Sequence, residues 1–132
     1  MPTYTNSPGV AAPFGLYSHA SRAGDLVFVA GQLGVREDGS LAGEDFAAQA
    51  RQTFENIGAI LASQGAAFAD VLKYTTYVVR PDLVDAWRSA REEIFQTLYP
   101  DGGYPPNTLL VIDGLVKPEF LIEIEAVAHV GV

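Results

Sequence analysis

One histidine near the start of the chain is of a type that can exchange protons close to neutral pH. His19 follows Tyr17 by two residues in "GLYSHAS" (15–21), where the alternating pattern predicts a strand that places both side chains on one face. A structural or surface histidine is the alternative interpretation. The other histidine, His129, lies far along the chain, and no third ligand stands at metal spacing. We therefore expect no metal site, and the absence of cysteine excludes disulfides, thiolate nucleophiles and cysteine-based metal sites.

Three further polar side chains stand on predicted elements. Asn107 in "PPNT" opens an apolar, strand-like segment, and Glu123 in "EIEA" lies on the last predicted strand. A strand glutamate is usually solvated, so a functional role for Glu123 requires a covered face. Arg88 lies on the flank of the apolar stripe of a predicted helix, and the simpler interpretation is a solvated arginine paired with Glu92 at i+4.

Hydrophobic patterning predicts the elements that must position these residues. Apolar positions recur at helical spacing from Phe46 until Gly65, and again after Pro81, where Asp82 followed by Asp85 indicates a helix start. Residues 1–13 are predicted to be an irregular N-terminal arm. The predicted strands are 15–21 and 25–35, which form a hairpin, 69–79, 107–113 and 120–130.

This order predicts an α+β fold in which a mixed β-sheet carries both helices packed on one face. The chain, residues 1–132, is long enough for a single domain and too short for two. The opposite sheet face is predicted to be too apolar to stay fully solvated. A symmetric oligomer that covers this face, with pockets between subunits, is the simplest answer. The apolar residues assigned to it are Leu109, Val111, Leu121 and Val127.

Composition excludes several classes of partner. The formal net charge is -8 and no run of basic residues occurs, so we expect neither nucleic acid nor a membrane as partner. The N-terminus lacks the features of a signal peptide, and no apolar run is long enough to span a bilayer. The expected location is cytoplasmic.

Four stretches resemble the RidA/YjgF family, the imine and enamine deaminases also called endoribonuclease L-PSP. They are "GLYSHA", "FVAGQLG", "AAQARQTFENIGAILASQGAAFADVLKYTTYV" and "LIEIEAVA", in family order and spacing over residues 13–130. The resemblance implies a chorismate-mutase-like fold and a homotrimer with clefts between subunits. It also implies cofactor-free hydrolysis of a reactive small metabolite to a keto acid and ammonia.

The resemblance also assigns roles to three residues. Tyr17 matches the family's cleft tyrosine, which orients substrate or water, and Gly31 matches a glycine whose backbone approaches the ligand. Glu123 matches the carboxylate that positions the attacking water. For each there is a structural alternative: a tyrosine at a subunit boundary, a glycine at a β-bulge and a solvated strand glutamate.

Two positions depart from the family pattern. Asn107 stands where the family has a carboxylate-binding arginine. An asparagine cannot donate the two charge-assisted hydrogen bonds that the arginine donates to a carboxylate. Arg88 aligns, within one residue, with a family asparagine, and it could return the missing charge to the cleft. With His19, these two residues complete the predicted substrate-binding set.

The expected function is therefore a RidA/YjgF-like deaminase acting on an imine, enamine or related metabolite. The loss of the arginine argues against ordinary 2-aminoacrylate as substrate. The alternative is a non-catalytic trimeric protein that binds a metabolite or regulates a partner. A ribonuclease is the weakest of the three readings, because the chain has no basic patch and no pair of histidines to serve as general bases.

Overall fold

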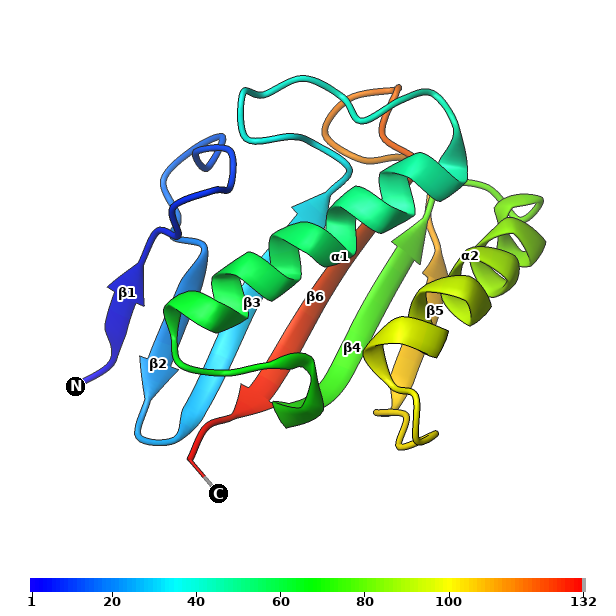
Figure 1. Ribbon diagram of the computed structural model, residues 1–132. Coiled ribbons are helices and arrows are strands. Elements are labelled where there is room, and N and C mark those ends of the chain that lie inside the picture. The colour runs from blue at the N-terminus through cyan, green and yellow to red at the C-terminus, as the bar shows by residue number, and fades with distance from the viewer. Residues whose placement is uncertain (132) are drawn as a thin grey trace.

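A single mixed sheet organises the chain in the computed structural model, which describes residues 1–131. Its strand order is β1-β2-β3-β6-β4-β5, with β4 and β5 parallel and every other neighbouring pair antiparallel. The predicted α+β class and mixed sheet are thus confirmed (Figure 1). The strands are β1 (Thr3–Thr5), β2 (Ala20–Ala23), β3 (Leu26–Leu33), β4 (Val71–Val78), β5 (Asn107–Val111) and β6 (Ile122–His129).

Both long helices, α1 (Phe46–Ser63) and α2 (Leu83–Leu98), cover the same face of this sheet, as predicted (Figure 1). The side chain of Asp45 caps α1 by accepting a hydrogen bond from the Ala48 amide. The predicted start of α2 is confirmed, with Asp82 at the N-cap position, but the Asp82 carboxylate accepts a hydrogen bond from Arg80 and makes no capping bond. In the part of the chain that the structure describes, no helix combines the length and the apolar character needed to cross a membrane.

The main core lies between the helices and the central strands. The alternation predicted for β6 is confirmed, since Ile122, Ile124 and Ala128 are fully buried beneath the helices. Phe54 of α1 joins the two helices by stacking on Trp87 of α2, with ring centroids 6.1 Å apart. A short 3₁₀ turn, η1 (Phe68–Asp70), leads from α1 into β4.

The N-terminal segment differs from the prediction in two ways. The expected irregular arm contains β1, which pairs with β2 and extends the sheet. The strand expected over 15–21 begins only at Ala20, because residues 15–17 turn, with the Tyr17 amide bonded to the Gly15 carbonyl. The hairpin itself is confirmed as β2–β3. Tyr17 is therefore a loop residue.

The face opposite the helices is partly apolar, although not with all the residues assigned to it. Phe28 of β3 and Leu110 of β5 are exposed on it. The assignment of Leu109 and Leu121 was wrong, because both pack against the main core. In the parallel β4–β5 register Leu109 lies beside buried Thr76, which puts its side chain on the helix-covered face.

A second, smaller core lies where β3 ends. Leu33 and Val35 pack with Phe120, and the ring of Phe14 stacks on Phe120 at 6.2 Å. The buried amide of Asn56 on α1 donates to the carbonyls of Leu33 and Val35 at 3.0 and 2.9 Å. This side chain therefore ties α1 to the end of β3.

We expect Asn56→Ala to lower the free energy of unfolding by about 2–4 kcal/mol, because each buried carbonyl left unpaired costs about 1–3 kcal/mol. Urea denaturation followed by circular dichroism measures this change. The control is Gln52→Ala, which removes the partly exposed amide bonded to the Asn56 side chain and should cost about 1 kcal/mol or less. Equal losses for the two variants would contradict this role of Asn56.

Candidate functional site

Gly31 and Glu123 are brought into direct contact by a break in the β3–β6 pairing. The register shifts between Val29 and Gln32, so Gly31 lies in a β-bulge. A Cβ placed on Gly31 would lie 2.8 Å from the carboxyl carbon of Glu123 and closer still to one of its oxygens. Any other residue here would displace the carboxylate, so the glycine is required by the position of Glu123.

Glu123 lies on the sheet face opposite the helices, in a partly apolar setting. Its neighbours in the chain, Ile122 and Ile124, point into the main core, and its register partner on β3 is buried Leu33. Burial raises the pKa of the Glu123 carboxyl above its ordinary value, and the nearby charge of Glu125 raises it further. A carboxylate with a raised pKa is a better proton acceptor than a solvated one.

Tyr77 and Glu125 form a pair on the same face that the sequence did not single out. The Tyr77 hydroxyl donates to Glu125 at 2.6 Å, and this bond, together with burial, raises the pKa of Tyr77 to about 12. Tyr77 is also the register partner of Glu123 on β4. The alternation of Glu123 and Glu125 in "EIEA" was the available sequence signal. Tyr77 could be assigned only from the pairing of β4 with β6.

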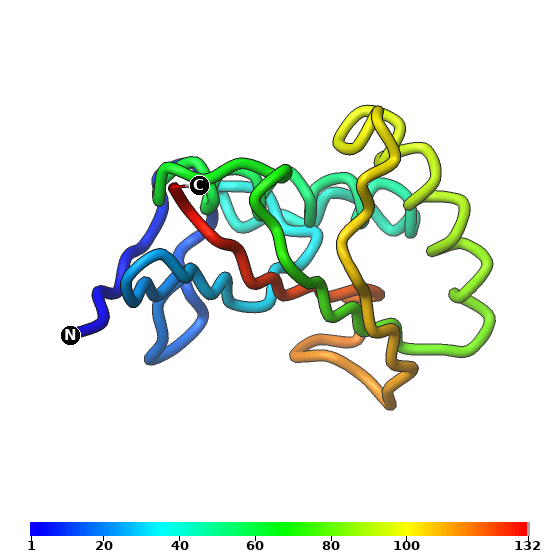
Figure 2. Tube along the Cα trace, turned by 90° about the horizontal axis from the view of Figure 1, so that it is seen from below, coloured from blue at the N-terminus to red at the C-terminus, as the bar shows by residue number. Residues whose placement is uncertain are grey.

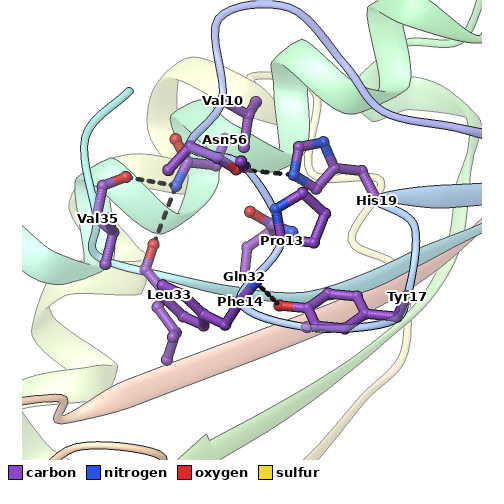
Figure 3. A pocket seen from close by; sticks show the side chains of 12 residues that line it. Val10, Pro13, Phe14, Tyr17, His19, Gln32, Leu33, Val35 and Asn56 are labelled. Carbon is purple, nitrogen blue, oxygen red and sulfur yellow. Dashed lines mark hydrogen bonds between the residues drawn. The ribbon is translucent and has the colours of Figure 1, made fainter. Parts of the chain in front are cut away.

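Tyr17 lies beside Gly31 on the loop that precedes β2. Its phenol oxygen accepts a hydrogen bond from the Phe14 amide at 3.1 Å, and its own O–H has no acceptor within residues 1–131 (Figure 3). Tyr17 and Gly31 line a small cavity of about 30 Å³ with the polar side chains of Gln32 and Asn56. A space of that size holds about one water molecule.

His19 also borders this cavity, but both of its ring nitrogens are engaged. Nδ1 accepts from the Ser7 amide at 2.9 Å, and Nε2 lies 2.8 Å from the Ala11 carbonyl, to which it can donate. The side chain is only 3% exposed. Because residues 15–19 are not a strand, His19 does not share a strand face with Tyr17, and its contacts instead hold the N-terminal segment in place.

Asn107 and Arg88 lie together in a different place. They line a groove of about 610 Å³ between α2 and the first residues of β5, together with Arg91. The Oδ1 atom of Asn107 accepts a 2.7 Å hydrogen bond from the hydroxyl of buried Thr76, which places this amide on the helix-covered face. Arg88 pairs at 3.5 Å with Asp85, so the expected partner, Glu92, was wrong.

The predicted residues thus form two groups within one chain. The first group consists of Tyr17, on the loop before β2, and of Gly31 and Glu123, which meet in the β3–β6 pairing. The second group, Asn107 and Arg88, lies by β5 and α2. The ribbon of Figure 1 and the tube of Figure 2 both place β1 at one end of the molecule and α2 at the other. One chain alone does not bring the two groups into a common cleft. Among residues 1–131 no three His, Asp or Glu side chains gather where they could hold a metal ion.

Comparisons with known proteins agree on one family. The family model described as Endoribonuclease L-PSP matches residues 7–130. RutC family protein YjgH of Escherichia coli is 36% identical over 111 residues, 83% of this chain and 81% of that protein. The 2-iminobutanoate/2-iminopropanoate deaminase of Salmonella typhimurium is 34% identical over 124 residues, 93% of this chain and 91% of that protein.

Solved structures agree with the fold. The crystal structure of the YjgF gene product of Escherichia coli has a TM-score of 0.88 at 26% identity, covering 98% of this chain and 99% of that chain. That of RidA from an Antarctic Psychrobacter has a TM-score of 0.85 at 29% identity, covering 97% and 99%.

The raised pKa of Glu123 predicts that this residue makes stability fall as pH rises. Between the unfolded and the folded pKa the folded protein binds more protons, so the stabilisation present below the unfolded pKa is lost as pH rises through the folded pKa. We expect Glu123→Gln to raise the free energy of unfolding at neutral pH. The gain should vanish below about pH 4, where the carboxyl is protonated in both states.

Urea denaturation at a series of pH values measures this effect. The control is Glu119→Gln, at an exposed carboxylate, which should change stability by no more than about 0.5 kcal/mol. A Glu123→Gln difference that is the same at every pH would show that the carboxyl is not destabilised by burial.

Proposed function

Because the chain belongs to the RidA/YjgF (endoribonuclease L-PSP) family, we propose that it is a cofactor-free deaminase acting on an imine or enamine metabolite. The observation that carries this proposal is the contact between Gly31 and Glu123. It sets a half-buried carboxylate of raised pKa against a glycine in a bulge, and the same glycine lines a cavity of single-water size together with Tyr17. An imine needs little more than a placed water and a proton acceptor to be hydrolysed.

The proposed reaction is an addition followed by an elimination. Glu123 accepts a proton from water as the water oxygen bonds to the imine carbon, and the imine nitrogen takes up a proton to give an amino alcohol. The hydroxyl proton then passes to the amino nitrogen as the C–N bond breaks, so that the products are a ketone and ammonia. Tyr17, whose O–H is free to donate, is suited to orienting the substrate or the water. An enamine enters the same route after protonation at carbon.

The complete cleft is proposed to form between two chains of a homotrimer. Within one chain, Asn107 and Arg88 line the groove by α2, whereas Glu123 lies on the open sheet face, so we assign the missing part of the cleft to a second copy. The exposed side chains of Phe28 and Leu110 support such an assembly, because they leave the open sheet face partly apolar.

Asn107 sets the limit on the substrate. Its Oδ1 is occupied by Thr76, which leaves the neutral Nδ2–H group to meet a ligand where the family pattern has an arginine. This replacement argues against ordinary 2-aminoacrylate. The related deaminase of Salmonella typhimurium is named for 2-iminobutanoate and 2-iminopropanoate, imines that carry a carboxylate, so that class is tested first.

The neutral side chain of Asn107 also favours the alternative of a non-catalytic protein. A trimer that keeps the cleft but holds a carboxylate only through a neutral amide could bind or sense a metabolite, or regulate a partner, without turning the metabolite over. The two functions differ in one observable, the rate of imine hydrolysis.

We expect the protein to accelerate ammonia release from at least one imine generated in situ by an amino-acid oxidase from a panel of amino acids. Glu123→Gln should lower that rate by about 100-fold or more, the usual contribution of a positioned proton acceptor. Unchanged rates for every imine would overturn the deaminase and leave the binding protein.

Two further measurements divide the remaining possibilities. Asn107→Arg restores the family's residue, and if asparagine is the only defect this variant should gain turnover of 2-aminoacrylate. Continued inactivity would mean that the cleft has been rebuilt more widely. Native mass spectrometry should show three copies, and a monomer would remove the cleft between chains.

A further inference from the structure

We propose that the groove between α2 and β5 is a carboxylate-binding subsite in which Arg91, assisted by Arg88, supplies the positive charge that Asn107 lacks. This inference rests on the proposed function, since it assigns the groove to the same cleft. It goes further by naming the substrate class, 2-imino acids with an extended apolar side chain. The groove is large enough, at about 610 Å³, for a ligand well beyond a three-carbon acid.

Arg91 is held in place without an acidic partner. Its guanidinium carbon lies 5.5 Å from the centroid of the Trp87 ring, a cation–π contact on the same helix. No carboxylate within residues 1–131 lies within 4.0 Å of its nitrogens, and the side chain is partly buried. A positioned guanidinium with unused donors suits bidentate binding of a carboxylate, and little side-chain freedom remains to be lost.

Arg88 adds a second charge to the same groove. Its ion pair with Asp85 is long, at 3.5 Å, and both side chains are mostly exposed, so the pair is weak and a ligand can compete with it. Glu92 is the carboxylate that lines the groove, against two guanidiniums. The groove lining therefore carries one more positive than negative side chain, with Asp85 outside it as the partner of Arg88, on a chain whose net charge is -8.

Neutral donors complete the polar side of the groove. The Thr76 hydroxyl occupies Oδ1 of Asn107, so the amide can offer only its N–H group as a donor to an anion. Gln96 of α2 lines the groove as well. An asparagine beside two arginines is compatible with carboxylate binding, whereas an asparagine alone would bind a carboxylate weakly.

The opposite wall is aromatic. Tyr104 is 63% exposed and stacks on the buried ring of Phe95, with centroids 6.0 Å apart and planes 20° apart, and Pro105 adjoins it. An exposed, ordered ring offers an apolar side chain a flat surface. Charge on one wall and an aromatic surface on the other favour a ligand that has both a carboxylate and an apolar body.

Trp87 provides a direct test, since it is the only tryptophan of the chain and lies under Arg91. Binding of 4-methyl-2-oxopentanoate, the product expected from such an imine, should change Trp87 fluorescence, and calorimetry should give the same dissociation constant. The methyl ester of this acid removes the charge, and pyruvate removes the apolar body. The methyl ester and pyruvate should each bind at least about tenfold more weakly than 4-methyl-2-oxopentanoate.

We expect Arg91→Gln to weaken binding of 4-methyl-2-oxopentanoate by about tenfold or more in calorimetry, and Arg88→Gln to weaken it less. The control is Arg80→Gln, which removes the same charge just before α2, lines a different groove and should leave binding unchanged. Folding of each variant is checked by urea denaturation.

Failure of the subsite and failure of the deaminase give different results. Binding that is equally strong in Arg91→Gln, or no binding of any carboxylate, overturns the subsite whether or not imines are hydrolysed. Binding that depends on Arg91 in a protein that hydrolyses no imine supports the subsite and assigns it to a metabolite-binding protein.

Discussion

The position of β6 between β3 and β4 is the constraint on which the rest of the structure depends. Its even-numbered residues, Ile122 to Ala128, are buried beneath the helices and its odd-numbered residues emerge on the open face. Side chains of one strand alternate strictly, so burying the isoleucines forces Glu123 and Glu125 to the other face. The same pairing brings Gly31 from β3 and Tyr77 from β4 against these two carboxylates.

This alternation also places the two groups of predicted site residues on opposite faces of the sheet. The parallel pairing of β5 with β4 aligns Asn107 and Leu109 with buried Tyr74 and Thr76, so their side chains share the face that the helices cover. The carboxylate group and the α2–β5 groove then lie on opposite faces of one sheet. The proposal of a cleft between two copies follows from this separation, and the exposed Phe28 and Leu110 support it.

Much of the fold could be predicted because the spacing of apolar residues along the chain is a strong local signal. Both helices and the last strand followed directly from spacings of 3.6 and two residues. The N-terminal region could not be predicted in this way. The alternation in "GLYSHAS" continues through a turn, and β1 forms only because the edge of β2 accepts a partner. The sequence suggested His19 as a substrate-binding residue because it does not show the hydrogen-bond partners of the ring. These partners, the backbone groups of Ser7 and Ala11, come close to His19 only in the folded N-terminal segment.

Local order and spacing were sufficient for the family resemblance, the α+β architecture and the expectation that Asn107 stands where the family pattern has an arginine. Tertiary structure alone decided which chemical groups meet. Pairing of β3 with β6 set Gly31 against Glu123, and pairing of β4 with β5 turned Asn107 toward α2 and its arginines. Strand register and helix packing are long-range properties, fixed by which apolar face is buried, and no local pattern specifies them.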